Sequence, residues 1–224
     1  MFSRIITREL ATPLGAMLAG VREPDPALCV LEFTDRPRLS EELEDLAAAV
    51  GPVEPVGTIE TATPATDLLD EAERQVTDYF NRTRTAFDLP LHAPGTDFQQ
   101  AVWNELLRIP PGTTTTYGAI AEKLHRPGAQ RAVGAANGAN RISIIIPCHR
   151  VIDANGKLHG YGGGIARKRA LLELEQDSLF SPAKSKPART PARTSAETAP
   201  AAQPARPRPA HPAGSPATSS SWRP

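Results

Sequence analysis

The first ninety residues contain apolar positions with two different spacings. Residues 27–33, ALCVLEF, form a continuous apolar run rich in β-favouring residues, which predicts a buried strand. Residues 40–50 and 65–82 instead repeat apolar side chains every three or four positions. This spacing predicts two amphipathic helices, the first with Ser40 as its N-cap. Together these elements indicate a small α/β unit whose apolar faces form its core.

From residue 96 onward the apolar spacing is that of helices. Thr96, followed three residues later by Gln99, forms a capping box ahead of a helix with one apolar face, and PPG at 110–112 ends that helix. HRPG at 125–128 separates two further short helices. This region is therefore expected to be mostly helical, and the predicted helices cover residues 97–109, 115–124, 129–140 and 165–176.

Composition divides the chain into three parts. The linker LPLHAPGT separates an N-terminal α/β domain, residues 1–92, from a C-terminal domain, residues 93–180. Residues 181–224 contain 10 of the 23 prolines and almost no large apolar side chains. This Pro/Ala/Arg-rich tail cannot bury enough apolar surface to offset chain entropy, so we expect it to be disordered. The predicted fold class is α+β.

The formal net charge of zero conceals a segregation of charge along the chain. Residues 1–91 hold 8 basic and 17 acidic residues, residues 92–180 hold 10 and 7, and residues 181–224 hold 7 and 1. A basic C-terminal half is typical of proteins that face a polyanion, although an ordinary solvated surface gives the same count. The tail is either a source of loose phosphate contacts or a solubilising segment.

Three absences from the sequence restrict the class of protein. The N-terminus lacks the apolar core and cleavage site of a signal peptide, and no apolar run is long enough for a transmembrane helix. Cys29 and Cys148 make no disulfide framework, as expected in a reducing compartment. We therefore expect a cytoplasmic protein that does not associate with a membrane.

The helices at 115–124 and 129–140, joined by a tight turn that contains glycine, indicate a helix-turn-helix. The second helix consists mainly of Ala and Gly, with Arg131 as its long cation. Such a helix suits close approach to a backbone or a narrow groove, whereas a major-groove reader carries more polar side chains. Arg131 is then either a DNA contact or one partner of a surface ion pair.

The run IIIPCHRVI, residues 144–152, carries candidate chemistry. Its isoleucines predict a buried strand that leads to a bend at Pro147. If Cys148 and His149 cooperate, the bend is needed, because adjacent residues of a strand point to opposite faces. Cys148 is either an inert core thiol or a nucleophile whose pKa is lowered by the neighbouring imidazole of His149.

A third group must orient the imidazole if Cys148 and His149 cooperate. Glu175 shares a helical face with Leu171 and Leu172, so its carboxylate requires a buried partner. Glu173 points elsewhere and is expected to be exposed to solvent. Glu175 is therefore the candidate for the third group.

GYGGG at 160–164 places Tyr161 among four glycines. These glycines form either a flexible turn or a place where backbone approaches a ligand. Neither a Walker nor a dinucleotide-binding spacing is present, so a phosphate cradle is not expected. No CxxC or HxxxH pair accompanies Cys148 and His149, so we expect no metal site and no cofactor.

Taken together, these motifs resemble a single family. From about Thr96 to Asp177 the chain is similar to the O6-alkylguanine-DNA alkyltransferases, the methylated-DNA–protein-cysteine methyltransferases that repair alkylated guanine. The resemblance is carried by TDFQQAVWNELLRIPPGTTTTYGAIA, RAVGAANGAN, IPCHRVI, GYGGG and the helix that reaches Glu175. It implies a ribonuclease-H-like N-terminal domain and a winged helix-turn-helix-like C-terminal domain.

The resemblance also implies a set of catalytic roles. Cys148 would accept the alkyl group, with His149 as its base through a water and Glu175 holding the imidazole. Tyr117 would assist rotation of the nucleotide and protonate guanine N3, and Asn140 would brace the active-site turn. The product thioether is not hydrolysed, so the protein would be consumed in one turnover.

The implied partner is double-stranded DNA that carries O6-alkylguanine or O4-alkylthymine, bound by a monomer. Arg131 would fill the gap left by the extruded nucleotide, while its helix rests in the minor groove. The implied DNA-binding residues are Arg131, Ala129, Gly134 and Ala135. The carbonyl of Cys148 would also read the flipped base, and the other residues implied in the base pocket are Val151, Tyr161 and Gly162.

Two residues depart from the family pattern. Arg141 follows Asn140 where many relatives have proline, which either loosens the turn or adds a phosphate contact. Gly162 lies where a residue with a small side chain is frequent, which suggests a wider pocket for bulkier alkyl groups.

Three other functions each fit part of the sequence. A non-catalytic module that binds alkylated DNA would lack the acceptor cysteine. A Cys-His-Glu hydrolase leaves the helix-turn-helix unexplained. A transcription regulator would need more base-reading side chains on its second helix.

Overall fold

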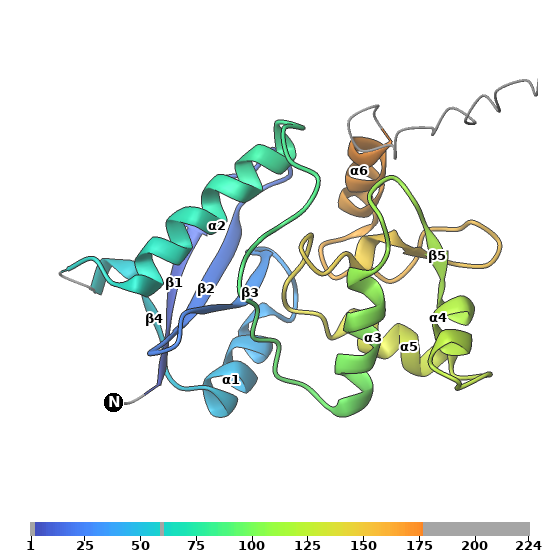
Figure 1. Cartoon of the computed structure of the whole chain (residues 1–224), viewed down its shortest axis with the longest axis horizontal. Helices are drawn as coiled ribbons and strands as arrows, with labels where there is room; N and C mark the ends of the chain where they lie inside the picture. Colours follow the sequence, from blue (N-terminus) through green and yellow to red (C-terminus); the bar gives the residue numbers. More distant parts are fainter. Residues whose placement is uncertain (1–2, 59–60, 177–224) are drawn as a thin grey trace, which may run out of the picture. The chain divides into compact units, whose positions relative to one another are not determined.

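The computed structural model describes residues 3–58 and 61–176, which form a mixed α+β fold (Figure 1). The tail that the sequence predicts to be disordered, residues 181–224, lies outside the described residues. Within the described ranges no helix is both long and apolar enough to span a lipid bilayer.

The N-terminal region contains a four-stranded sheet with strand order β3-β2-β1-β4 (Figure 1). β1 (Arg4–Leu10), β2 (Met17–Glu23) and β3 (Ala27–Phe33) are antiparallel neighbours, and β4 (Val53–Pro55) runs parallel to β1. The predicted strand at 27–33 is confirmed, since all seven residues of β3 are buried. β1 and β2 were not predicted, because polar residues or a glycine interrupt their apolar runs.

Each face of this sheet packs against its own apolar cluster. Ile5 and Ile6 are neighbours on β1 and point to opposite faces. Ile5 belongs to a small cluster with Cys29 and with Leu46 of α1 (Leu39–Ala49), whereas Ile6 belongs to the main core, which includes α2 (Pro64–Phe80). The two amphipathic helices therefore cover opposite faces of the sheet.

The starts of these two helices differ in their capping. α1 begins at Leu39 with no side-chain cap, so the prediction that Ser40 caps it is wrong. α2 begins at a capping box formed by Thr63 and Thr66, with Pro64 in its first turn. A 3₁₀ turn, Val56–Thr58, ends the first described range, and α2 lies in the second.

The C-terminal region is mostly helical, as predicted. Thr96 and Gln99 form the expected capping box, and the hydroxyl of Thr116 accepts a hydrogen bond from the backbone N–H of Ala119. Two-residue parallel strands, β5 and β6, join the segment before α4 to the segment after Cys148. The elements are α3 (Asp97–Leu107), β5 (Thr115–Thr116), α4 (Tyr117–Lys123), α5 (Gln130–Gly138), β6 (Val151–Ile152) and α6 (Ile165–Glu175).

The isoleucine run before Cys148 is buried, but it is not a strand. Residues 143–145 form a turn, and only Ile142 makes an isolated bridge, with Leu31 of β3. Ile144 adopts a φ of 73°, a left-handed conformation that β-branched residues rarely take. The prediction of a strand here is wrong, because a short apolar run indicates burial without specifying the backbone conformation.

Backbone hydrogen bonds link the outer edge of β3 to two later segments. The N–H of Leu28 donates to the carbonyl of Pro90, and the N–H of His92 donates to the carbonyl of Leu28. The N–H of Leu31 donates to the carbonyl of Arg141, and the N–H of Ser143 donates to the carbonyl of Leu31. The edge strand of the sheet is therefore covered by the linker and by the segment that leads to Cys148.

Candidate active site

Cys148 lies at the start of a 3₁₀ turn, Cys148–Arg150, directly after Pro147. The predicted bend is confirmed, since Pro147 has φ −81° and ψ 63° and the helical turn follows it at once. The thiol is almost enclosed, with 4% of the residue exposed. The turn places Cys148 and His149 in one compact segment rather than on opposite faces of a strand.

Asn140 is hydrogen-bonded to the backbone on both sides of the isoleucine run. Its side-chain oxygen accepts from the N–H of Ile142 at 3.0 Å, and its amide nitrogen donates to the carbonyl of Ile146 at 2.9 Å. Asn137 donates to the carbonyl of Cys148 at 3.4 Å. These contacts hold the turn in which Ile144 adopts its left-handed conformation.

His149 and Glu175 form a fully buried pair, with 2.9 Å between His149 Nε2 and Glu175 Oε1. Glu175 is the last residue of α6 and accepts four further hydrogen bonds: from Tyr79 Oη, from Nε and Nη2 of Arg150, and from the N–H of Gly112. Burial tends to raise the pKa of this carboxyl, but the hydrogen bonds of His149 and Arg150 outweigh it and lower the pKa to about 2. Glu175 is therefore an anion at neutral pH.

This arrangement determines which nitrogen of His149 holds the proton. Burial lowers the pKa of His149, so its imidazole is neutral near pH 7. An ionised carboxylate can only accept a hydrogen bond, so Nε2 must carry the proton that it shares with Glu175. Nδ1 is then the basic nitrogen, and it is buried with no hydrogen-bond partner among the described residues.

Cys148 does not have the lowered pKa that its neighbouring imidazole suggested. Burial raises the pKa of the thiol to about 11, and the positive charges of Arg36 and Lys168 offset this only in part. No hydrogen bond joins Cys148 directly to His149 within the described part of the chain. The resting thiol is therefore protonated, and its reactivity depends on removal of that proton during the reaction.

Tyr117, at the start of α4, lies between α5 and the glycine-rich segment. Its hydroxyl is 3.5 Å from the point where a Cβ at Gly160 would lie, and its ring is 3.9 Å from the equivalent point at Gly134. Burial and the nearby negative charge of Asp153 raise the pKa of Tyr117, so this phenol keeps its proton at neutral pH.

Val151 and Tyr161 are buried beside the turn that holds Cys148. The carbonyl of Val151 accepts a hydrogen bond from Lys168 Nζ at 2.6 Å, and the same ammonium group donates to the backbone carbonyl of His159. A carbonyl oxygen has two lone pairs, so Val151 retains one for a further donor.

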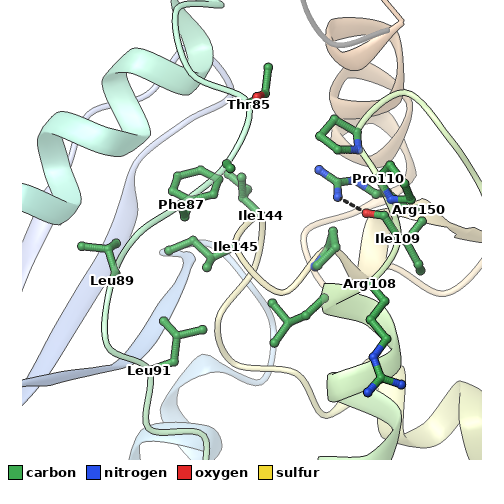
Figure 2. Close-up of a pocket in the computed structure, with 14 residues that line it drawn as sticks. Thr85, Phe87, Leu89, Leu91, Arg108, Ile109, Pro110, Ile144, Ile145 and Arg150 are labelled. Carbon is green, nitrogen blue, oxygen red and sulfur yellow. Dashed lines mark hydrogen bonds between the residues drawn. The ribbon is translucent and has the colours of Figure 1, made fainter. Parts of the chain in front are cut away.

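A separate cavity of about 220 Å³ lies beside the same turn (Figure 2). Its lining is mostly apolar and includes Phe87, Leu89 and Ile144, and the guanidinium of Arg150 donates to the carbonyl of Ile109 at its margin (Figure 2). Cys148 does not line it. This cavity is thus distinct from the space into which the thiol would react.

The chain matches known proteins over the segment that carries these residues. Residues 97–177 match the family model described as 6-O-methylguanine DNA methyltransferase, DNA binding domain. The methylated-DNA–protein-cysteine methyltransferase of Mycobacterium tuberculosis is 59% identical over 114 residues, which cover 51% of this chain and 69% of that protein. The crystal structure of the M. tuberculosis O6-methylguanine methyltransferase is similar with a TM-score of 0.60 and 40% identity, over 81% of this chain and 96% of that one.

The chain belongs to the methylated-DNA–protein-cysteine methyltransferase family. A structure of M. tuberculosis OGT in complex with DNA is also similar to this methyltransferase, with a TM-score of 0.58 and 41% identity over 77% of this chain and 92% of that one.

The surface of α5 in this methyltransferase carries few large side chains. Arg131 is exposed near its N-terminus and makes no ion pair with any residue in the described ranges, so the alternative of a surface salt bridge finds no partner there. Ala135 is also exposed, whereas Ala129 and Gly134 are half-buried. Arg141 pairs with Asp45 of α1, with 3.1 Å between Nη2 and Oδ2.

Several residues that contact the candidate site were not found from the sequence. Lys168 lies on the same face of α6 as Leu171 and Glu175, so the argument that identified Glu175 applies equally to it. Tyr79 and Arg36 come from the N-terminal region, and no local pattern indicates that they approach the site. Glu173, expected to be solvent-exposed, is exposed.

Within the described residues no group of three His, Cys, Asp or Glu side chains is arranged to hold a metal ion.

Proposed function

We propose that this protein repairs DNA by transferring an alkyl group from O6 of guanine, and from O4 of thymine, to Sγ of Cys148. The observation that carries the proposal is the placement of a buried thiol beside the His149–Glu175 pair. This pair lies within the segment that matches the methyltransferase family. The name of the M. tuberculosis relative states the same reaction class for that protein.

The thiol proton leaves through His149. Nδ1 is the unpartnered basic nitrogen of a neutral imidazole, and a water between Nδ1 and Sγ would carry the proton. The imidazolium that forms is stabilised by the Glu175 anion through Nε2. A thiol with a raised pKa is therefore activated only when the substrate is in place, which protects it from other alkylating or oxidising agents.

The transfer step is an in-line displacement at the alkyl carbon. The thiolate forms the new C–S bond while the O6–C bond breaks. The electron pair of the broken bond passes to O6 and the guanine ring. Tyr117 donates its proton to N3, so guanine leaves as the neutral base, and the tyrosinate that remains is reprotonated through solvent as the His149 imidazolium gives up the thiol proton. The thioether at Cys148 is stable to water, so each molecule reacts once and no cofactor is consumed.

The DNA is bound through α5 in the minor groove, with Arg131 inserted in place of the flipped nucleotide. The exposed small residues of α5 permit close approach to the sugar-phosphate backbone. In this proposal the N-terminal domain (residues 1–92) is ribonuclease-H-like, and the C-terminal domain (93–180) is a winged helix-turn-helix-like module. The protein acts as a monomer in the cytoplasm.

Intact mass spectrometry tests the proposal directly. After incubation with a duplex that contains one O6-methylguanine, we expect a gain of one methyl group per protein, located on the peptide that contains Cys148. An unmodified protein that still binds the duplex would indicate a non-catalytic binding module. Repeated turnover of a thioester or peptide would indicate a hydrolase. Either outcome contradicts the proposal.

Replacing Arg131 by alanine should slow transfer from duplex DNA by about tenfold or more, and should leave transfer from the free base O6-benzylguanine within about twofold. The side chain is needed only to occupy the space of an extruded nucleotide, and a free base requires no extrusion. Rates from single-turnover mass measurements provide the comparison. Arg126→Ala, at another arginine near α5, is the matched control. Equal slowing on both substrates would rule out the insertion role.

A further inference from the structure

Arg36 follows β3 and is buried, although arginine is normally exposed. Its guanidinium donates to the carboxylates of Glu32 and Glu42, whose negative charges stabilise the buried cation. The same group donates from Nη2 to the carbonyl of Gly138 at 2.8 Å and from Nη1 to the carbonyl of Asn140 at 3.2 Å. One side chain from the N-terminal region therefore binds the carbonyl end of α5 and the residue that braces the active-site turn.

Those carbonyls are suitable partners for a cation. The last carbonyls of a helix have no partner within the helix and carry a partial negative charge. Glu32 extends the connection, since it also accepts a hydrogen bond from Ser143 Oγ at 2.7 Å, inside the turn that leads to Cys148. Arg36 and Glu32 together thus contact the turn and the end of α5.

Gly162 faces the same guanidinium from the glycine-rich segment. A Cβ at Gly162 would lie 2.5 Å from Cζ and from Nη1 of Arg36, closer than real Cβ contacts allow. The guanidinium cannot easily move away, because four acceptors hold it. Glycine is needed at position 162 because the guanidinium of Arg36 approaches its backbone closely. Arg36 fills the space that a side chain at this position would occupy, so Gly162 does not give the wider pocket that the sequence suggested on this side.

A cavity of about 350 Å³ lies between these elements. Its lining combines glycines of α5 and of the glycine-rich segment with the guanidinium of Arg36 and the ring of Tyr161, and it includes Gly134, Gly138, Gly160 and Gly162. Glycines alone would make these walls flexible. Arg36 is the buried, multiply bonded group in this lining.

We propose that Arg36 is a positioning residue that holds the end of α5 and the glycine-rich segment at a fixed separation around the base pocket, with Gly162 as its steric complement. This inference rests on the proposed function, because it assigns to the flipped base a cavity that is lined by Tyr161 and Gly162 although not by Cys148 itself. It makes the N-terminal region a structural part of the pocket, although no residue of that region would touch the reacting atoms.

A double-mutant cycle tests the inference with the full-length protein and O6-benzylguanine as the probe. Gly162→Ala alone should weaken the apparent binding constant for the free base about tenfold, because the added methyl group displaces the guanidinium. In an Arg36→Met background the same change should cost less than about twofold, because the clashing group is gone. If Gly162→Ala weakened the binding constant by the same factor in both backgrounds, the two positions would be independent and the proposal would be overturned.

Additional variants separate positioning from loss of folding. Arg36→Met leaves Glu32 and Glu42 buried without the cation that they share, so Arg36→Met combined with Glu32→Gln provides a background with the same net charge as the original cluster. The transfer rate at saturating base should stay within about threefold of the unmodified protein, whereas the binding constant changes. A merely structural role would instead reduce the fraction of protein that reacts, leave both constants unchanged, and refute the proposal. Arg141→Ala, which removes the ion pair with Asp45, is the control and should change neither constant.

The same cycle measured by urea unfolding needs no activity. Coupling between positions 36 and 162 in the unfolding midpoint, in a protein that transfers no alkyl group, would show that the contact exists while the proposed function fails. Absence of coupling in both measurements would refute the inference alone, provided that the unmodified protein still transfers the alkyl group.

Discussion

Replacing Glu175 by alanine is expected to lower the free energy of unfolding by about 3–5 kcal/mol, because it leaves a buried cation without its anion. The guanidinium of Arg150 binds both oxygens of Glu175, and His149 and Tyr79 each lose a buried acceptor. Alkyl transfer should fall by about a hundredfold or more, since the imidazolium loses its stabilising charge. Urea unfolding and single-turnover mass measurements give the two values.

Glu173→Ala on the same helix is the matched control for this variant. Its side chain is exposed, so the change should alter stability by no more than about 0.5 kcal/mol and leave transfer unchanged. If Glu175→Ala behaved like Glu173→Ala, the carboxylate would have no role in holding His149.

Acid sensitivity provides an independent check on the same group. The pKa of Glu175 is about 2 in the folded protein and near 4.5 when it is unperturbed. The anion therefore stabilises the fold fully above about pH 4.5, and this contribution is lost progressively as the pH falls toward 2. A Glu175→Gln variant has no carboxylate to protonate. Its free energy of unfolding should therefore fall less steeply between pH 4.5 and pH 2 than that of the unmodified protein.

Replacing Cys148 by alanine should abolish alkyl transfer while preserving the fold and the binding of alkylated duplex. No other group in the turn supplies a nucleophile, since His149 is occupied by Glu175 and its free nitrogen is enclosed. Loss of a small buried side chain costs on the order of 1 kcal/mol, which leaves the protein folded. Mass spectrometry and a duplex-binding titration measure the two properties.

Cys29→Ala is the matched control, because Cys29 is equally buried and burial raises its pKa to about 11 as well. It lies on β3, with its sulfur hydrogen-bonded to the carbonyl of Ala27 and with no imidazole in the same turn. We expect transfer at the unmodified rate. Labelling of Cys29 in the unmodified protein would show that burial, and not the His149–Glu175 pair, governs reactivity.

The elements with strong local signals were predictable from the sequence. The Thr96 capping box and the helix that ends at Glu175 lie where the apolar spacing placed them. The burial of Glu175 with a polar partner followed from a simple physical conflict, a carboxylate on an apolar helix face. Applied to Lys168, the same reasoning would have found a second buried charge on that face.

Features that depend on tertiary packing were not predictable. The isoleucine run is buried by a strained turn and not by a strand, because Asn140 supplies the hydrogen bonds that a sheet would otherwise provide. The pKa of Cys148 rises because burial outweighs the nearby cations, and no local pattern reports the depth of burial. Arg36 lies about a hundred positions from the carbonyls that it binds.

The covered edge of β3 has a consequence for protein engineering. Exchanging the N-terminal region for that of a relative would join a foreign strand edge to residues 90–92 and 141–143, whose hydrogen bonds are matched to this one. A mismatch would shift the segment that carries Asn140 and the turn to Cys148, or leave a strand edge open to aggregation. Chimeras should therefore transplant β3 together with both segments that pair with it.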